Sequence, residues 1–167
     1  MAITMQSRTG VGVFFQVEGW EKMVRSVLEA KKRAGDMGPI WELVATDFAA
    51  EETQVFAHGG AWGGYTAWAP VQEKVAKAKA RQGFQSAVLV GSGRLKNSLT
   101  QRGHPEFRYE PTPLTLKLGT RVPYASSHDE GTTHLPQRSL IRITPQAQSR
   151  WASLMTQYIT EAFESGR

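Results

Sequence analysis

Cysteine is missing from this sequence of 167 residues, and its absence excludes several kinds of chemistry at once. Disulfide frameworks, thiol nucleophiles and zinc sites with cysteine ligands all require that side chain. Long apolar runs are also missing, because none approaches the roughly 20 residues that span a bilayer. The first residues, MAITMQSRTG, lack the apolar segment of a secretory signal. We therefore expect no membrane partner, and the lack of cysteine fits a reducing compartment.

Motifs for catalysis or cofactor binding are missing as well. His128 and His134 in HDEGTTH are six residues apart, whereas the helical zincin pair needs a spacing of four. The GSG at 91–93 does not match the nucleophile motif G-x-S-x-G, and no Gly-Lys-Ser/Thr follows it as a phosphate loop requires. The sequence thus predicts no catalytic residue, no cofactor and no bound metal. One alternative stays open, in which loop residues bind zinc with Asp129 as a third ligand.

The composition is that of a globular protein. A hydrophobic fraction of 40% and an aromatic fraction of 10% argue against disorder. The length predicts one domain over 1–167, with 1–17 as an N-terminal arm or strand and 144–167 as a C-terminal helix. A net charge of +5 leaves acidic partners or nucleic acid open, beside the simpler interpretation of a solvated basic surface.

The N-terminal third predicts a strand followed by two helices. Residues 11–17 alternate as a strand does. Residues 18–33 form one apolar helical stripe, and a second helix starts near Pro39 with Asp36 as a nearby cap and ends at Gly59-Gly60. The short glycine-containing turn between them predicts a helical hairpin. The first stripe consists of Trp20, Met23, Val24, Val27 and Leu28, and the buried side of the second helix of Trp41, Val44, Phe48 and Val55.

The middle of the chain combines glycine, aromatic and basic residues. HGGAWGGYTAWAP, at 58–70, fits neither a regular helix nor an ordinary strand, and we interpret it as a flexible or extended connection whose aromatic side chains dock. Residues 71–82 predict a short basic helix. Its cations either contact DNA or a partner, or face water. They are Lys74, Lys77, Lys79 and Arg81.

The last part of the chain alternates with the period of strands and then returns to a helix. The segments 95–101, 107–111, 114–120 and 138–144 predict strands, with a turn at Pro111–Pro113. Short connections make them antiparallel neighbours. Thr144-Pro145 predicts the start of a final helix, whose apolar stripe runs from Trp151 to Phe163. The expected fold class is α+β, a small and mostly antiparallel sheet packed with two N-terminal helices and one C-terminal helix.

In their order and spacing, these segments resemble the phage virion morphogenesis family, the tail completion proteins of Mu-like and related tailed phages. The resemblance covers residues 56–143, and each piece is short, so order and spacing carry it together. Val71 departs from the usual Leu, and Arg138-Ser139-Leu140-Ile141 stands where the family has an Arg-Pro-Phe-Leu-like segment. The matching positions are Trp68, Pro70, Lys74, Leu89, Ser92, Gly93, Leu95, Ser98, Gly119, Thr120, Tyr124, Ala125, His128, Gly131 and Arg138.

The physical chemistry of these positions fits a structural motif. Gly93 and Gly131 are expected in turns that a side chain would strain. Trp68 is expected to anchor the irregular segment on the core, and Tyr124 to bury its ring while its hydroxyl bonds the backbone. His128 is expected as a hydrogen-bonding residue of a loop that connects the sheet to the segment at Arg138, and His134 at the surface.

The resemblance implies a non-enzymatic assembly protein of the neck or the head-proximal end of the tail. It would complete the tail for joining to a DNA-filled head. Its partners would be other neck and tail proteins, copies of itself in a ring, and packaged DNA through non-specific contact. It would reside in the virion, and in the host cytoplasm during assembly. The alternatives are a head-side adaptor, a tail terminator or a sequence-nonspecific DNA-binding module.

Overall fold

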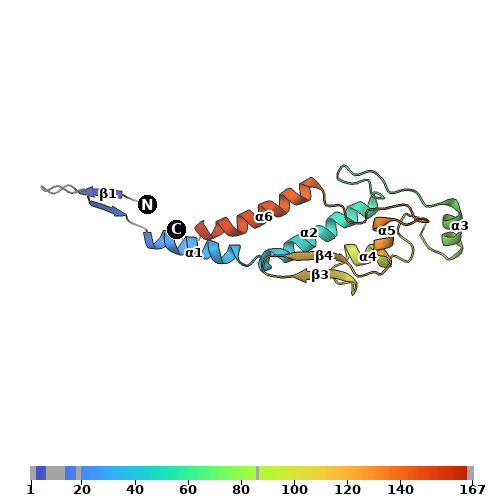
Figure 1. The fold of residues 1–167 in the computed structure, drawn as a ribbon, viewed down its shortest axis with the longest axis horizontal. Coiled ribbons are helices and arrows are strands. Elements are labelled where there is room, and N and C mark those ends of the chain that lie inside the picture. Colours follow the sequence, from blue (N-terminus) through green and yellow to red (C-terminus); the bar gives the residue numbers. More distant parts are fainter. Residues whose placement is uncertain (1–2, 7–13, 18–19, 86, 165–167) are drawn as a thin grey trace.

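Ten helices and strands make up the part of the chain that the computed structural model describes, residues 3–6, 14–17, 20–85 and 87–164 (Figure 1). The strands form two separate antiparallel hairpins, and six helices accompany them. The predicted α+β class is confirmed. The elements are β1 Ile3–Gln6, β2 Phe14–Val17, α1 Trp20–Ala34, α2 Gly38–Ala57, α3 Glu73–Arg81, α4 Arg94–Thr100, β3 Phe107–Pro111, β4 Leu116–Thr120, α5 Ala125–Glu130 and α6 Pro145–Glu164.

Helix α2 lies at the centre of the molecule. Its start follows the predicted chemistry, since Pro39 stands in the first turn and the Asp36 carboxylate accepts the Gly38 N–H at 2.9 Å. The predicted buried side is confirmed, because all four of its residues are buried. The helix is apolar on most sides, as a helix covered on several faces must be.

The β3–β4 hairpin covers one side of α2. Phe107 pairs with Thr120 and Pro111 with Leu116, so the turn lies at 112–115 and includes the predicted Pro113. The Trp41 indole donates to the Thr112 carbonyl at 2.8 Å and joins this turn to the start of α2. We thus find the predicted hairpin, but the sheet at this site has two strands.

Residues 94–100 are helical, and the strand predicted over 95–101 is wrong. Gly93, with φ of +86°, turns the chain immediately before α4. Leu95 and Leu99, one helical turn apart, are 3% and 0% exposed. Two apolar residues four positions apart share one side of a helix and also one side of a strand. In a segment this short the sequence cannot separate the two, and the structure shows that Leu95 and Leu99 reach the core from a helix.

The predicted helical hairpin of α1 and α2 is also wrong. Met37 donates its N–H to the Pro113 carbonyl at 2.7 Å, which ties the link to the β3–β4 turn, and α1 continues away from α2 (Figure 1). It packs instead against α6, where Ser26 and Ala30 are buried and Arg33 donates to the Tyr158 carbonyl at 2.8 Å. The apolar stripe of α1 therefore stays largely in solvent.

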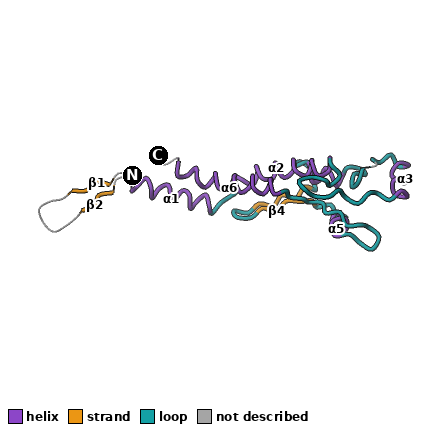
Figure 2. The backbone as a smooth tube through the Cα atoms, turned by 90° about the horizontal axis from the view of Figure 1, so that it is seen from above, coloured by secondary structure: helices purple, strands orange, loops and turns teal. Residues whose placement is uncertain are grey.

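Strands β1 and β2 pair with Ile3 opposite Val17 and lie beyond the start of α1 (Figure 2). The strand predicted over 11–17 is described from Phe14 onward, and 11–13 lie outside the described residues. Helix α6 begins as predicted: the Thr144 hydroxyl accepts the Ala147 N–H at 3.1 Å. Its apolar side packs on α2, except that Phe163 is 46% exposed.

The segment 138–144 is extended but has no strand partner among the described residues, so the strand predicted there is wrong. Its alternation is real, since Arg138, Leu140, Arg142 and Thr144 are all buried. The Leu140 N–H donates a hydrogen bond to the Asp129 carboxylate at 2.7 Å, and the Arg142 N–H donates one to the Glu52 carboxyl group at 3.3 Å. Side-chain carboxyl oxygens thus replace the carbonyls of a neighbouring strand.

The glycine-rich segment 58–70 docks through its aromatic side chains, as predicted. Trp68 is 4% exposed and packs edge-on against Phe56, with ring centroids 5.1 Å apart. Trp62 donates to the Glu51 carboxylate at 3.0 Å, and the Tyr65 hydroxyl to the Ile143 carbonyl at 3.1 Å. Gly60 allows this packing, because a Cβ there would lie 2.8 Å from the indole of Trp68.

We predict that Gly60→Ala destabilises the protein more than Gly64→Ala. Both glycines have φ of +90°, so alanine strains the backbone at each. A Cβ at Gly64 would meet nothing within 4 Å, whereas at Gly60 the new methyl meets Trp68. Overpacking of this kind costs about 1–3 kcal/mol beyond the shared strain. Thermal melts of the two variants measure the difference, and equal melting temperatures would show that Trp68 is not held against Gly60.

We also predict that Glu52→Gln flattens the pH dependence of stability. Burial raises the pKa of Glu52 to about 8, against a usual value of 4.5. Between these values the native state holds a proton that the unfolded chain has lost. The resulting stability is complete below pH 4.5 and disappears as the pH rises through about 8. Urea unfolding at both ends of this window gives the slope for each protein, and an unchanged slope in the variant would contradict the assignment.

Candidate functional site

Three of the residues that carry the family resemblance, Trp68, Pro70 and Arg138, meet where segment 68–70 crosses segment 138–142. The Trp68 indole donates to the Ser139 carbonyl at 2.7 Å. Arg138, 7% exposed, donates to the carbonyls of Ala69 and Pro70 at 2.9 and 3.1 Å. Each donor thus satisfies a carbonyl on the other segment, and the two irregular segments are joined without a β-ladder.

Arg142 completes this crossing. Its guanidinium donates to the carbonyls of Gly60, at 2.6 Å, and Thr66. It also lies over the ring of Tyr65, 5.3 Å from the centroid, and over Trp68 at 5.9 Å. We call Trp68, Arg138 and Arg142, with the carbonyls they bind, the backbone lock.

A second cluster connects α4 to β4. Ser98 is fully buried, and its hydroxyl donates to the Leu95 carbonyl at 2.8 Å and lies 2.7 Å from the Thr120 hydroxyl. Thr120 in turn accepts the Val122 N–H at 3.1 Å. The resemblance residues of 93–98 and 119–120 are therefore brought together, and their polar atoms are used within the fold.

Residues 125–131 form a short helix and a turn rather than the plain loop that we predicted. Ala125 is buried, and the His128 carbonyl accepts the Arg138 N–H at 2.8 Å. Gly131 has φ of +77°, and a Cβ there would lie 2.9 Å from the Gln137 nitrogen. The close return of the chain thus agrees with the turn expected at Gly131, and it places Arg138 beside α5.

Two expectations for this stretch are wrong. Tyr124 was expected to bury its ring, but it is 41% exposed and meets His128 edge-on, with centroids 6.0 Å apart. His128 was expected in a loop, but it lies in α5; its carbonyl does accept a hydrogen bond, from the Arg138 N–H, while no described residue bonds its buried Nδ1. Burial, and then the nearby Arg138, lowers the pKa of His128. His134 lies at the surface, as predicted.

A groove of about 470 Å³ opens between α3 and α5, and we call it the α3 groove. Its walls include Val75, Phe84, Tyr124 and Leu135, which are 47%, 42%, 41% and 37% exposed. Leu89 also lines it and has φ of +59°, an unusual value for a residue with a branched side chain. Lys79, Arg94 and Arg138 also line the groove, so its walls combine apolar and cationic side chains.

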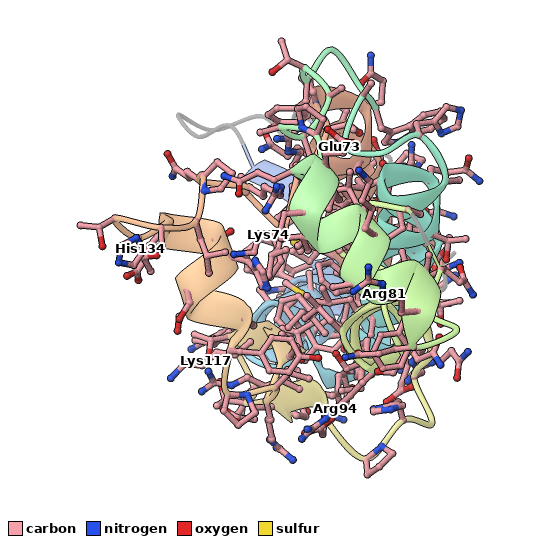
Figure 3. All side chains as sticks on the ribbon, turned by 90° about the vertical axis from the view of Figure 1, so that its right-hand side faces the viewer. Glu73, Lys74, Arg81, Arg94, Lys117 and His134 are labelled. Atoms are coloured by element: carbon pink, nitrogen blue, oxygen red, sulfur yellow. The ribbon has the colours of Figure 1, made fainter. Side chains whose placement is uncertain are left out.

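The four predicted contact cations do not behave alike. Lys74, Lys77 and Arg81 are exposed on α3, which crosses this end of the molecule (Figure 3). The Lys79 ammonium instead donates to the carbonyls of Ala87, at 2.8 Å, and Val90, at 3.4 Å. Burial, and then Arg138, lowers its pKa. Lys79 holds the 87–90 loop onto α3, and the other three cations of this helix stay exposed to a partner.

No group of three or more metal-ligating side chains gathers anywhere among the described residues. Within the same ranges, no helix has the length and apolar character to cross a bilayer. The described site consists of apolar surface, side chains that bind backbone carbonyls, and exposed cations.

Two central residues were missed from the sequence, Arg142 and Glu52. Glu52 is 1% exposed, and one of its carboxylate oxygens accepts the Arg142 N–H. A signal for Arg142 existed. It follows Leu140 by two residues and Arg138 by four, so strand alternation places all three on one side. If Leu140 faces the core of an extended segment, the arginines two residues before and after it face the core as well.

The comparison with known families agrees with the resemblance seen in the motifs. The sequence matches the phage virion morphogenesis family over residues 16–160. No curated protein and no solved structure matches this chain. The family match extends beyond the motif region 56–143 and takes in α1 to α5 and most of α6. The chain therefore belongs to the phage virion morphogenesis family and has a structural part in the assembly of phage particles.

Proposed function

We propose that this chain is a non-enzymatic subunit of the neck or the head-proximal tail end, and that it completes the tail for head–tail joining. It acts as one domain over 1–167, forms a homo-oligomeric ring and contacts other neck and tail proteins. It works in the virion after assembly in the host cytoplasm. The finer placement, in the neck or tail, rests on the resemblance to tail completion proteins.

The observation that carries this proposal is how the family residues are used. The side chains of Trp68 and Arg138 donate hydrogen bonds to backbone carbonyls, and the Ser98 hydroxyl bonds Leu95 and Thr120. A nucleophile or a general base needs a polar group free to reach a substrate. The bonds of Trp68, Arg138 and Ser98 fix the backbone, which favours a scaffold that presents a surface to partners. We propose Trp68, Pro70, Gly93, Leu95, Ser98, Tyr124, Ala125, His128, Gly131 and Arg138 as this structural motif.

Loss of the protein should leave DNA-filled heads and assembled tails unjoined, and a plasmid copy should restore joined particles. Electron microscopy of lysates from a deletion phage gives the answer. Intact infectious particles would refute the joining role. Empty heads with normal tails would favour a head-side adaptor, and tails of irregular length a terminator, so each image decides among the alternatives.

Non-specific contact with packaged DNA is a second proposed role, favoured by the exposed cations on α3. Lys74, Lys77 and Arg81 all face solvent, and the ion pair of Lys77 with Glu73, at 2.6 Å, lies at the surface. Such a pair is worth little and yields readily to phosphate. A ring of subunits would repeat these cations around a channel and hold DNA without reading its sequence.

We predict that replacing Lys74, Lys77 and Arg81 by Gln weakens retention on a DNA column and reduces its salt dependence. The logarithmic salt slope falls by about 0.9 for each phosphate that the variant no longer neutralises. The matched control replaces Lys22, Lys31 and Lys32 of α1, which are also exposed and remove the same charge. Equal losses of retention in the two variants would mean that net charge, and not α3, binds DNA.

A further inference from the structure

The α3 groove combines apolar walls with cations and contains no acid. Its volume of about 470 Å³ falls within the roughly 300–1,000 Å³ of typical ligand sites. Val75 and Phe84 are 47% and 42% exposed there, and Lys79, Arg94 and Arg138 add three positive charges. None of the residues that line the groove is Asp or Glu. The groove therefore suits a ligand that carries both apolar and negative groups.

The positive charge in the groove is only partly compensated. Arg94 donates to the Glu106 carboxylate at 2.7 Å, and this ion pair offsets its charge. Lys79 and Arg138 instead donate to backbone carbonyls and form no ion pair with any described residue. Burial lowers the pKa of Lys79, and the charge of Arg138 lowers it further. Two like charges thus act on each other without a counter-ion, and a carboxylate beside them would relieve their repulsion.

Among the candidate occupants, a peptide segment with carboxylates next to apolar side chains supplies both kinds of group. A DNA duplex supplies negative charge, but its phosphates would leave the apolar walls of the groove uncovered. A second copy of the chain would bring a net charge of +5 toward cations of the same sign. Because the family acts in the assembly of phage particles, other virion proteins are the natural source of such a segment.

We propose that the α3 groove binds a segment of another virion protein in which carboxylates stand next to apolar side chains. The apolar side chains pack on Val75 and Phe84, and a carboxylate lies beside Lys79 and Arg138. Burial of the apolar groups supplies most of the affinity, and the charges orient the segment in the groove. This interface deepens the proposed function and rests on it for the identity of the partner as a neck or tail protein.

A direct test selects ligands for the purified full chain from a displayed library of random peptides. The library contains no phage protein, so its result does not depend on the joining function. We expect the enriched peptides to combine Asp or Glu with large apolar residues, and their binding to weaken as the salt concentration rises. In an enriched peptide, amides in place of the acids should weaken binding, and so should Ala in place of the apolar residues.

Matched variants show whether the peptides occupy the groove. Val75→Glu places a negative charge on the α3 wall, and like charge across the interface should weaken binding by about tenfold or more. Val27→Glu on α1 is the control, because both valines lie on helices, 47% and 49% exposed, and the change in charge is identical. The control should bind as the natural protein does. Leu135→Glu repeats the change at a second lining residue, and circular dichroism shows whether each variant keeps its fold.

Several results would overturn the proposal. These are a selection that enriches no peptide, enriched peptides without acids, and equal losses in Val75→Glu and Val27→Glu. Displacement of the selected peptides by a short DNA duplex would assign the groove to nucleic acid, and oligomers that only Val75→Glu abolishes would assign it to a second copy. A failed selection beside unjoined heads and tails in the deletion phage would reject only the groove. Acidic peptides in the groove beside an infectious deletion phage would reject only the joining function.

Discussion

Two buried arginines, Arg138 and Arg142, connect the parts of this protein that have no regular secondary structure. The segment 58–70 contains neither a helix nor a strand, and its carbonyls need donors once they leave water. A guanidinium has five N–H groups in a fixed plane, and each arginine here serves at least two carbonyls. These donors satisfy carbonyls of the segment, while its aromatic side chains supply the packing on the core.

Polarity is distributed in an unusual way between the inside and the outside. Arg138, Arg142 and Glu52 are buried, while Trp20 and Leu28 are more than half exposed. The two arginines bond backbone carbonyls and so favour one arrangement of the chain, and exposed apolar groups favour contact with a partner. Bonded polar groups inside and exposed apolar residues outside together suit a subunit that must keep its shape before it assembles.

The sequence predicted the elements whose signals are local. The β3–β4 hairpin, α2 and α6 each carry a turn or a cap beside a clear period, and they were found near their true positions. The failures have one physical origin. Whether α1 folds onto α2, and whether 138–144 joins a sheet, depends on contacts between distant residues such as Met37 with Pro113 and Arg142 with Glu52. The spacing of apolar residues along a segment indicates which side of the helix or strand is apolar, but it does not indicate which other element covers that side.

The same limit applied to the candidate site. The order of Trp68, Ser98 and Arg138 was enough to indicate the family, yet the roles of their side chains required the fold. Tyr124 shows the difficulty, because an aromatic residue beside a turn is equally compatible with burial and with lining an open groove. Lys79 shows it too, since nothing local separates it from the exposed cations of the same helix.

The partners in the backbone lock are far apart along the chain, which has a consequence for synthesis. Trp68 binds a carbonyl 71 residues later, and the arginine that binds Gly60 comes 82 residues after it. At roughly 5–20 residues per second, the glycine-rich segment leaves the ribosome several seconds before these partners exist. A chain that ends before Arg138 can still pack Trp68 on Phe56, but it lacks every donor and acceptor that 138–142 gives to the glycine-rich segment. The last contacts of this segment therefore form only after most of the chain has been made.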